Sequence, residues 1–193
     1  MNRKQFLEQP DVLGLIEWLI ENLPTLPVHL KVARSRFVRK AIDCKVQGIE
    51  AVQAEYQWGG NWETVKAELR RLRIRLRLAV RARDEFATHG ACEAILAWGN
   101  VDGAVGFLKE QMHDKNLVNY LKQCQALLAL DRKQQLNHLT KQNILRFDSG
   151  MTKIHALLDT TGSPIYDGRV GAAIALLYRL YRQGTGTTAP QAL

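Results

Sequence analysis

One stretch near the C-terminus decides the predicted fold: Phe147-Asp148-Ser149-Gly150-Met151-Thr152-Lys153-Ile154-His155-Ala156-Leu157-Leu158-Asp159, continuing as Thr160-Thr161-Gly162-Ser163-Pro164-Ile165-Tyr166-Asp167-Gly168-Arg169-Val170. Its first half predicts a turn with a glycine that leads into a helix over residues 152–158. Its second half predicts a turn containing Gly162 and Pro164, followed by a helix over residues 169–181. Asp167 stands where this last helix is expected to begin.

The rest of the chain also favours helices. Apolar residues recur at helical spacing over residues 11–22, 30–56, 62–86, 91–98, 101–112, 117–130 and 133–145. Asp11 is expected to cap the first of these helices, and the run Gly59-Gly60-Asn61 predicts a turn and an N-cap before the third. We therefore expect an all-α fold of eight to ten helices with essentially no sheet.

Residues 71–78 are ambiguous, because Arg and apolar residues alternate there as in a strand. The same segment also has apolar residues at helical spacing, and strong helix formers flank it on both sides. We interpret residues 62–86 as one helix. We predict a single domain over residues 1–183, a bundle with two lobes over 1–90 and 91–183, and a flexible tail over 184–193, where Gly, Thr, Ala and Pro are frequent.

Composition limits the classes of protein. The 193 residues carry a formal net charge of +8 at pH 7, which modestly favours a polyanionic partner. Three cysteines stand far apart with no C-x-x-C pair, and the five histidines show no metal spacing. We expect no metal and no cofactor. The sequence shows no signal peptide and no membrane span, so we expect a cytoplasmic protein.

Residues 144–182 resemble the helix-hairpin-helix DNA glycosylases, the superfamily of 8-oxoguanine DNA glycosylase and endonuclease III. In that family a hairpin Leu-Pro-Gly-Val-Gly-x-Lys presents backbone N–H groups to a DNA phosphate, and a catalytic Asp heads the next helix. Phe147, Asp148, Ser149 and Met151 take the places of Leu, Pro and the two glycines, so the glycine pattern is degraded, whereas Thr152-Lys153 matches its end. Gly150 is expected to supply the one positive-φ position of the turn. The interval from Lys to Asp is about one helical turn shorter than in the family, which keeps the face of the helix in phase.

The resemblance implies a C-terminal helix-hairpin-helix-like element, a double-stranded DNA partner and a set of site residues. Lys153 and Asp167 would be catalytic, and Ser149, Gly150, Thr152 and Arg169 would bind DNA. A desolvated Lys attacks the anomeric carbon of the sugar and forms a Schiff base, while the Asp stabilises the cationic sugar. The alternative is structural: Asp167 caps its helix and Lys153 is a solvated first-turn residue. Arg169 either pairs with Asp167 or reaches a phosphate.

Two other features have more than one interpretation. Seven arginines between residues 70 and 83 either track a nucleic-acid backbone or are solvated and paired at i,i+4 with the acidic residues Glu63, Glu68, Asp84 and Glu85. His155, two residues beyond Lys153, is either a site residue or an ordinary polar position on the helix.

Two functions follow from these observations. The first is a DNA-binding protein of the helix-hairpin-helix glycosylase type, whose enzymatic form would be a base-excision glycosylase or abasic lyase. The second is a catalytically inactive helical interaction or accessory module of a multi-protein bacterial system, with a protein partner.

Overall fold

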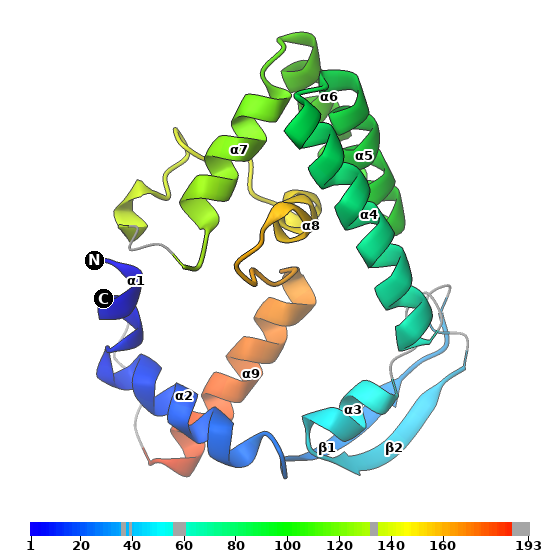
Figure 1. The fold of residues 1–193 in the computed structure, drawn as a ribbon. Coiled ribbons are helices and arrows are strands. Elements are labelled where there is room, and N and C mark those ends of the chain that lie inside the picture. Colours follow the sequence, from blue (N-terminus) through cyan, green and yellow to red (C-terminus); the bar gives the residue numbers. More distant parts are fainter. Residues whose placement is uncertain (36–37, 39, 56–60, 132–134, 187–193) are drawn as a thin grey trace. The chain divides into compact units, whose positions relative to one another are not determined.

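The structure is a computed structural model, and it describes residues 1–35, 38, 40–55, 61–131 and 135–186. Over these residues the chain is mostly helical, with nine α-helices, one short 3₁₀ helix and one two-stranded sheet (Figure 1). The elements in chain order are α1 (Arg3–Leu7), α2 (Pro10–Asn22), β1 (Pro27–Val32), β2 (Ile42–Gln47), α3 (Ile49–Ala54), α4 (Trp62–Ala82), α5 (Glu85–Trp98), α6 (Val105–His113), α7 (Leu117–Leu128), η1 (Leu136–His138), α8 (Ser149–Leu158) and α9 (Gly168–Gly184).

The chain divides into two compact units. The first comprises Met1–Phe6 and Leu69–Ala173, and the second comprises Leu7–Glu68 and Ile174–Leu193. Helices α1, α4 and α9 therefore contribute residues to both units.

Helix α8 is the centre of the first unit. All of its residues except Ser149 are buried, and it contacts α5 and α7, which in turn contact each other and α6 (Figure 1). Its apolar residues join one continuous core with those of α4, α5 and α7, in which Leu76, Ile95, Leu121 and Ile154 are fully buried. Because α8 is surrounded by protein, its polar ends need partners inside the protein.

The C-terminal end of α8 is satisfied by Arg77 of α4. Its Nε donates to the carbonyl oxygens of Leu157 and Leu158, each at 3.2 Å, and its Nη2 donates to the carbonyl oxygen of Asp159. A cation near helix C-terminal carbonyls also interacts favourably with the helix dipole. Arg77 therefore links α4 to the central helix.

The second unit contains the sheet. Strands β1 and β2 are antiparallel, with Val28 opposite Val46 and Leu30 opposite Cys44. Gly48 follows β2 with φ of +84°, and a Cβ there would lie 2.1 Å from the carbonyl oxygen of Pro24, so only glycine fits.

The helix predicted over residues 30–56 is wrong. Most of that segment is β2 and α3 with the end of β1, so the expectation of essentially no sheet fails at this one two-stranded sheet. The expectation of a mainly helical fold with eight to ten helices is confirmed by the nine α-helices of the described residues. Ile42, Cys44 and Val46 alternate with polar residues, and this period of two decides the strand once β1 pairs with it.

Two smaller predictions are also wrong. Within residues 135–145 of the helix predicted over 133–145, the structure has only η1 and turns. Asp11 does not cap α2, because Gln9 is the N-cap residue and Pro10 lies in the first turn.

The helical interpretation of residues 71–78 is confirmed, since α4 runs without a break through them. The predicted end at residue 86 is wrong, because α4 ends at Ala82 and Asp84 caps the next helix, α5. Asn61 caps that helix through its Oδ1, which accepts from the backbone N–H of Thr64 at 2.9 Å. The predicted glycine turn at 59–60 and the tail residues 187–193 lie outside the described residues. The helices predicted over 91–98, 101–112, 117–130, 152–158 and 169–181 are confirmed as α5 to α9, with shifted bounds.

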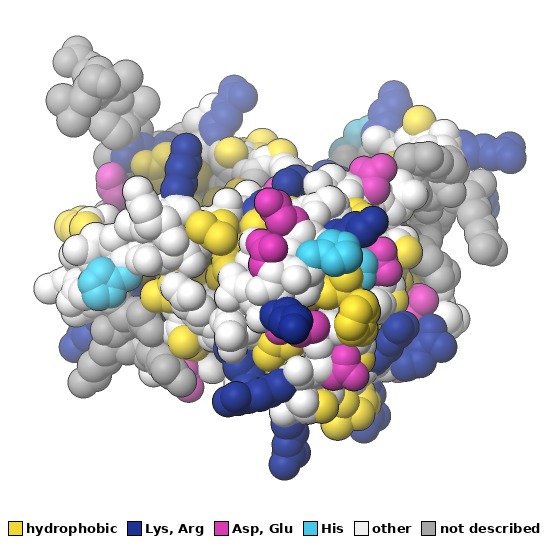
Figure 2. Space-filling model, turned by 90° about the horizontal axis from the view of Figure 1, so that it is seen from above, with side chains coloured by type: hydrophobic (Ala, Val, Ile, Leu, Met, Phe, Trp, Pro, Cys, Tyr) yellow, Lys and Arg dark blue, Asp and Glu magenta, His cyan; other side chains and the backbone are white. Residues whose placement is uncertain are grey.

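Charge is distributed rather than gathered on the face drawn in Figure 2. Lys and Arg side chains lie there in several separate groups, with Asp and Glu side chains between them. The net charge of +8 therefore does not by itself identify a binding surface on this face.

The contacts of Arg77 predict its contribution to stability. Replacing it in Arg77→Met removes the donors of three carbonyl groups at the end of the buried helix, which we expect to lower the free energy of unfolding by about 1–3 kcal/mol. Urea unfolding followed by circular dichroism measures the change. Arg73→Met is the matched control, because Arg73 is exposed on the same helix, and it is expected to change stability by less than about 0.5 kcal/mol. Equal effects of the two variants would contradict the capping role.

Candidate functional site around helix α8

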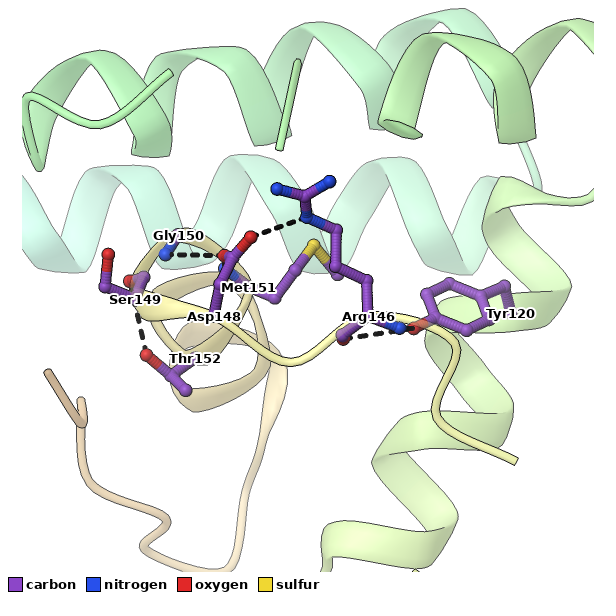
Figure 3. A network of polar contacts seen from close by, with 7 residues as sticks. All are labelled: Tyr120, Arg146, Asp148, Ser149, Gly150, Met151 and Thr152. Carbon is purple, nitrogen blue, oxygen red and sulfur yellow. Dashed lines mark hydrogen bonds and ion pairs between the residues drawn. The ribbon is translucent and has the colours of Figure 1, made fainter. Parts of the chain in front are cut away.

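Asp148 organises the start of α8 (Figure 3). Its Oδ1 accepts from the backbone N–H groups of Gly150 and Met151, each at 2.9 Å, and its Oδ2 pairs with Arg146 Nε at 2.5 Å. Burial raises the pKa of Asp148, but the two amides and the Arg146 guanidinium outweigh it and hold the pKa below its ordinary value. Asp148 is thus an ionised N-cap.

The Asp148 cap binds the backbone N–H groups to which the glycosylase resemblance assigns a DNA phosphate contact. The N–H groups of Gly150 and Met151 point to the Asp148 carboxylate, whose negative charge repels a phosphate at the same place. The expectation of a positive φ at Gly150 is wrong, because Gly150 lies in the first turn of α8 and positive φ belongs to Gly162, at +99°. Gly150 instead permits close packing, since a Cβ there would lie 2.8 Å from Leu96.

Lys153 is buried, with 5 % of its surface exposed. Its Nζ donates to the Ser149 carbonyl oxygen at 2.8 Å, and its stem lies against Gly99, where a Cβ would come within 2.7 Å of its Cδ and Cε. Burial lowers its pKa and the charge of Arg169 lowers it further, whereas Asp167 and Asp148 raise it; the balance is a lowered pKa. Lys153 is therefore not the solvated residue of the structural alternative.

Asp167 caps α9. Its Oδ1 accepts from the backbone N–H groups of Arg169 at 2.9 Å and Val170 at 3.2 Å, and its Oδ2 pairs with Arg169 Nη2 at 2.9 Å. Burial raises the pKa of Asp167, but Arg169 and the two amides lower it below its ordinary value. Of the two expectations for Arg169, the structure shows the ion pair, with 74 % of the Arg169 side chain still exposed.

Thr152 brings the two helices together. Its hydroxyl lies within hydrogen-bonding reach of the carbonyl oxygens of Tyr166 and Ser149, so α8 is joined to the residue before Asp167. Thr152 and Gly150 are both buried, and Ser149 is partly buried. Of the four residues predicted to bind DNA, only Arg169 is exposed.

A cavity of about 260 Å³ lies along α8 and the segment before α9. Its lining is almost entirely apolar and includes two aromatic rings; the lining residues are Leu128, Leu130, Phe147, Thr152, His155, Ala156, Ser163, Pro164 and Tyr166. Tyr166 is the neighbour of Asp167 in sequence. Sequence reasoning missed this cavity, because its walls come from three separate segments that only the fold brings together.

His155 is the unusual residue of the cavity. It is 5 % exposed, and its Nδ1 and Nε2 are buried with no hydrogen-bond partner in the part of the chain that the structure describes. Its ring stacks on Phe147 with centroids 6.5 Å apart and an angle of 15° between the planes. Burial lowers the pKa of His155 to about 4, so the ring is neutral at pH 7 and offers one donor and one acceptor.

No protein-family model, curated protein or solved structure matches the chain. Among the described residues, no group of three or more His, Cys, Asp and Glu side chains is placed to hold a metal ion. None of the helices in the described ranges combines the length and the apolar character needed to cross a membrane.

The buried His155 predicts a specific pH dependence of stability. The unfolded chain binds a proton near pH 6.5 and the folded chain only near pH 4, so stability falls as the pH drops between these values. The full loss is about 3 kcal/mol, at about 1.4 kcal/mol per pKa unit. Urea unfolding at a series of pH values measures it, and His155→Phe should flatten the curve in this window. The lowered carboxyl pKa values of Asp148 and Asp167 also make stability fall as the pH drops, but mainly below their unfolded pKa of 3.8 and therefore below this window. An unchanged curve in the variant would contradict the assignment.

Proposed function

We propose that the chain binds DNA in the manner of the helix-hairpin-helix glycosylases, and that the cavity along α8 receives a nucleobase turned out of the duplex. The observation that carries this proposal is the cavity itself, which combines the rings of Phe147, Tyr166 and a neutral His155. Extruded bases are held by aromatic or apolar side chains and by hydrogen bonds to their polar edge. The His155 ring lines the cavity without an ionic charge while both of its nitrogens are buried, so contacts with the rings would hold the base.

Two charged groups next to the cavity support an enzymatic form of this proposal. Asp167 adjoins Tyr166 and is kept ionised, as stabilisation of a cationic sugar requires. Lys153 has a lowered pKa, as a nucleophilic amine requires. Neither Lys153 nor Asp167 is among the residues that line the cavity. The Lys153 ammonium is bonded to the Ser149 carbonyl and the Asp167 carboxylate to the start of α9, so each has to leave its present bonds before it reaches a sugar.

The phosphate contacts of the proposal differ from those of the family. The N–H groups of Gly150 and Met151 donate to Asp148 and are not available to a phosphate. The phosphate contact of the proposal is therefore made by Arg169, whose side chain is largely exposed beside Asp167. Arginine binds phosphate through a planar pair of N–H donors. A single such contact predicts weak, salt-sensitive affinity for DNA.

A second candidate function is a non-catalytic helical interaction module. The observation that favours it is that Asp148, Lys153 and Asp167 each use their polar atoms inside the protein, as two caps and one buried amine. Groups with such structural roles need no substrate to explain them.

Filling the cavity tests the binding proposal. Ala156→Phe places a ring in the cavity, so affinity for a duplex with an unpaired base should fall by about tenfold or more, the value of one stacked base. Affinity for a fully paired duplex should not change. Fluorescence anisotropy at low salt measures both, with Ala173→Phe, at an exposed position on α9, as the matched control. Equal affinity of Ala156→Phe and the natural chain for both duplexes, in a folded variant, contradicts the base pocket.

Borohydride trapping separates the two candidate functions. If Lys153 forms a Schiff base, borohydride should capture a covalent adduct with DNA that contains an abasic site or a damaged base, and Lys153→Ala should abolish it. Asp167→Asn should slow base release while DNA affinity stays the same, since the carboxylate acts on charge that develops in the transition state. If Asp167 is only a cap, Asp167→Asn is nearly silent, whereas Asp167→Ala costs about 0.5–2 kcal/mol of stability. Failure to trap any adduct across a panel of lesions supports the non-catalytic module.

A further inference from the structure

The part of α4 that belongs to the first unit carries an excess of positive charge. Residues 69–82 include six arginines and no acidic residue. Arg77 points inward to the end of α8, whereas Arg70, Arg71, Arg73, Arg75 and Arg81 are exposed. None of these five makes an ion pair within the described residues.

Three of the four acidic residues expected to neutralise this charge are used elsewhere, and the fourth, Glu68, makes no ion pair with these arginines among the described residues. Glu63 lies 3.9 Å from Lys66, and Asp84 caps α5 by accepting from the Ala87 N–H at 2.8 Å. Glu85 accepts from the backbone N–H of Val118 at 3.3 Å. Pairing within the helix therefore does not account for the arginines.

Large apolar side chains lie among these arginines. Ile74 is 49 % exposed and Leu78 is 61 % exposed. At 100° per residue, Ile74 and Leu78 form a stripe with Arg70 and Arg81 along one side and Arg71 and Arg75 along the other. We call these six residues the arginine face. A shallow apolar groove adjoins it, lined in part by Leu78, Ala79, Ala82 and Ala87.

The apolar stripe favours a protein partner. A phosphate backbone satisfies arginines but leaves Ile74 and Leu78 in water, whereas an amphipathic helix with acidic margins covers the stripe and pairs with the arginines. Protein interfaces typically have an apolar centre within a polar rim and are enriched in Arg.

The second unit carries a helix of this complementary kind. Helix α2 contains Asp11, Glu17 and Glu21 and no Lys or Arg. Leu13, Glu17 and Ile20 follow one another at i, i+4 and i+7, and Leu13 and Ile20 are 43 % and 70 % exposed. The opposite face packs inward: a Cβ at Gly14 would lie 2.4 Å from the Tyr181 hydroxyl, and the Trp18 and Tyr181 rings are 6.3 Å apart.

We propose that α2 of one molecule docks on the arginine face of a second copy of this chain. Leu13 and Ile20 cover Ile74 and Leu78, while Glu17 and Glu21 pair with arginines at the margin. The two segments have 13 and 14 residues, about 20 Å of helix each, so they match in length. Asp11 pairs with Arg182 of its own chain at 3.5 Å, which leaves Glu17 and Glu21 as the acidic residues of the contact. A single helix-on-helix contact is smaller than a standard stable interface, so the association is weak and falls with added salt.

Sedimentation velocity of the full chain over a range of concentrations, at low and high salt, tests this proposal. The natural chain should self-associate at low salt. The double variants Arg71→Glu/Arg75→Glu and Glu17→Arg/Glu21→Arg should each weaken self-association by about tenfold or more, because like charges then face each other. An equimolar mixture of the two should associate again, since a basic α2 then meets an acidic α4. Leu78→Gln should weaken association without a change of charge.

The control is Lys109→Glu/Lys141→Glu, which changes net charge as much as Arg71→Glu/Arg75→Glu at exposed positions outside α2, α4 and α9 and should leave association unchanged. A natural chain that stays monomeric at every concentration overturns the proposal. So does unchanged association in Arg71→Glu/Arg75→Glu, or failure of the mixture to associate. Loss of duplex DNA binding in that variant, with self-association intact, would assign the arginine face to nucleic acid instead.

Discussion

The burial of nearly every residue of α8 is the constraint on which the first unit depends. A helix inside a protein leaves unpaired amides at one end and unpaired carbonyls at the other, and no water is available to bind them. Asp148 accepts from two amides, and Arg77 donates to three carbonyl groups. Both charged groups therefore hold the core together from positions outside the helix. The close approach at Gly150 follows from the same packing, because a larger residue collides with Leu96.

The chemistry of the candidate site results from that burial. Lys153 and His155 lie on α8 and share its lack of solvent, and burial is the main cause of the lowered pKa of each. The same packing gives Lys153 an internal hydrogen-bond partner and leaves His155 without one in the described part of the chain. These two residues therefore differ in their surroundings: the lysine ammonium has a hydrogen-bond acceptor, whereas the two ring nitrogens of the histidine are buried without one among the described residues.

Helix α4 packs one face into the core of the first unit and exposes the other face to solvent. Leu72, Leu76 and Val80 enter the core, and Arg77 follows them to the end of α8. The opposite face keeps its arginines in water around Ile74 and Leu78. The alternation of Arg and apolar residues over 71–78, which resembles a strand in sequence, arises because apolar residues on one face build the core and those on the other stay exposed.

The sequence by itself determined the elements whose signals are local. Helices α4, α5 and α7 follow from apolar spacing and helix formers, and the helix start near Asp167 follows from its capping side chain. The sequence alone did not predict β2, because alternation of apolar and polar residues specifies a strand only when β1 pairs with it. It also predicted a helix over 135–145, where the apolar residues do not form one. It identified Lys153, His155 and Asp167 as candidates. Only the tertiary structure decided that Asp148 accepts from the first amides of α8, that Lys153 is buried and that three segments line a cavity. Burial and partner choice depend on residues far apart in the chain, and no local pattern encodes them.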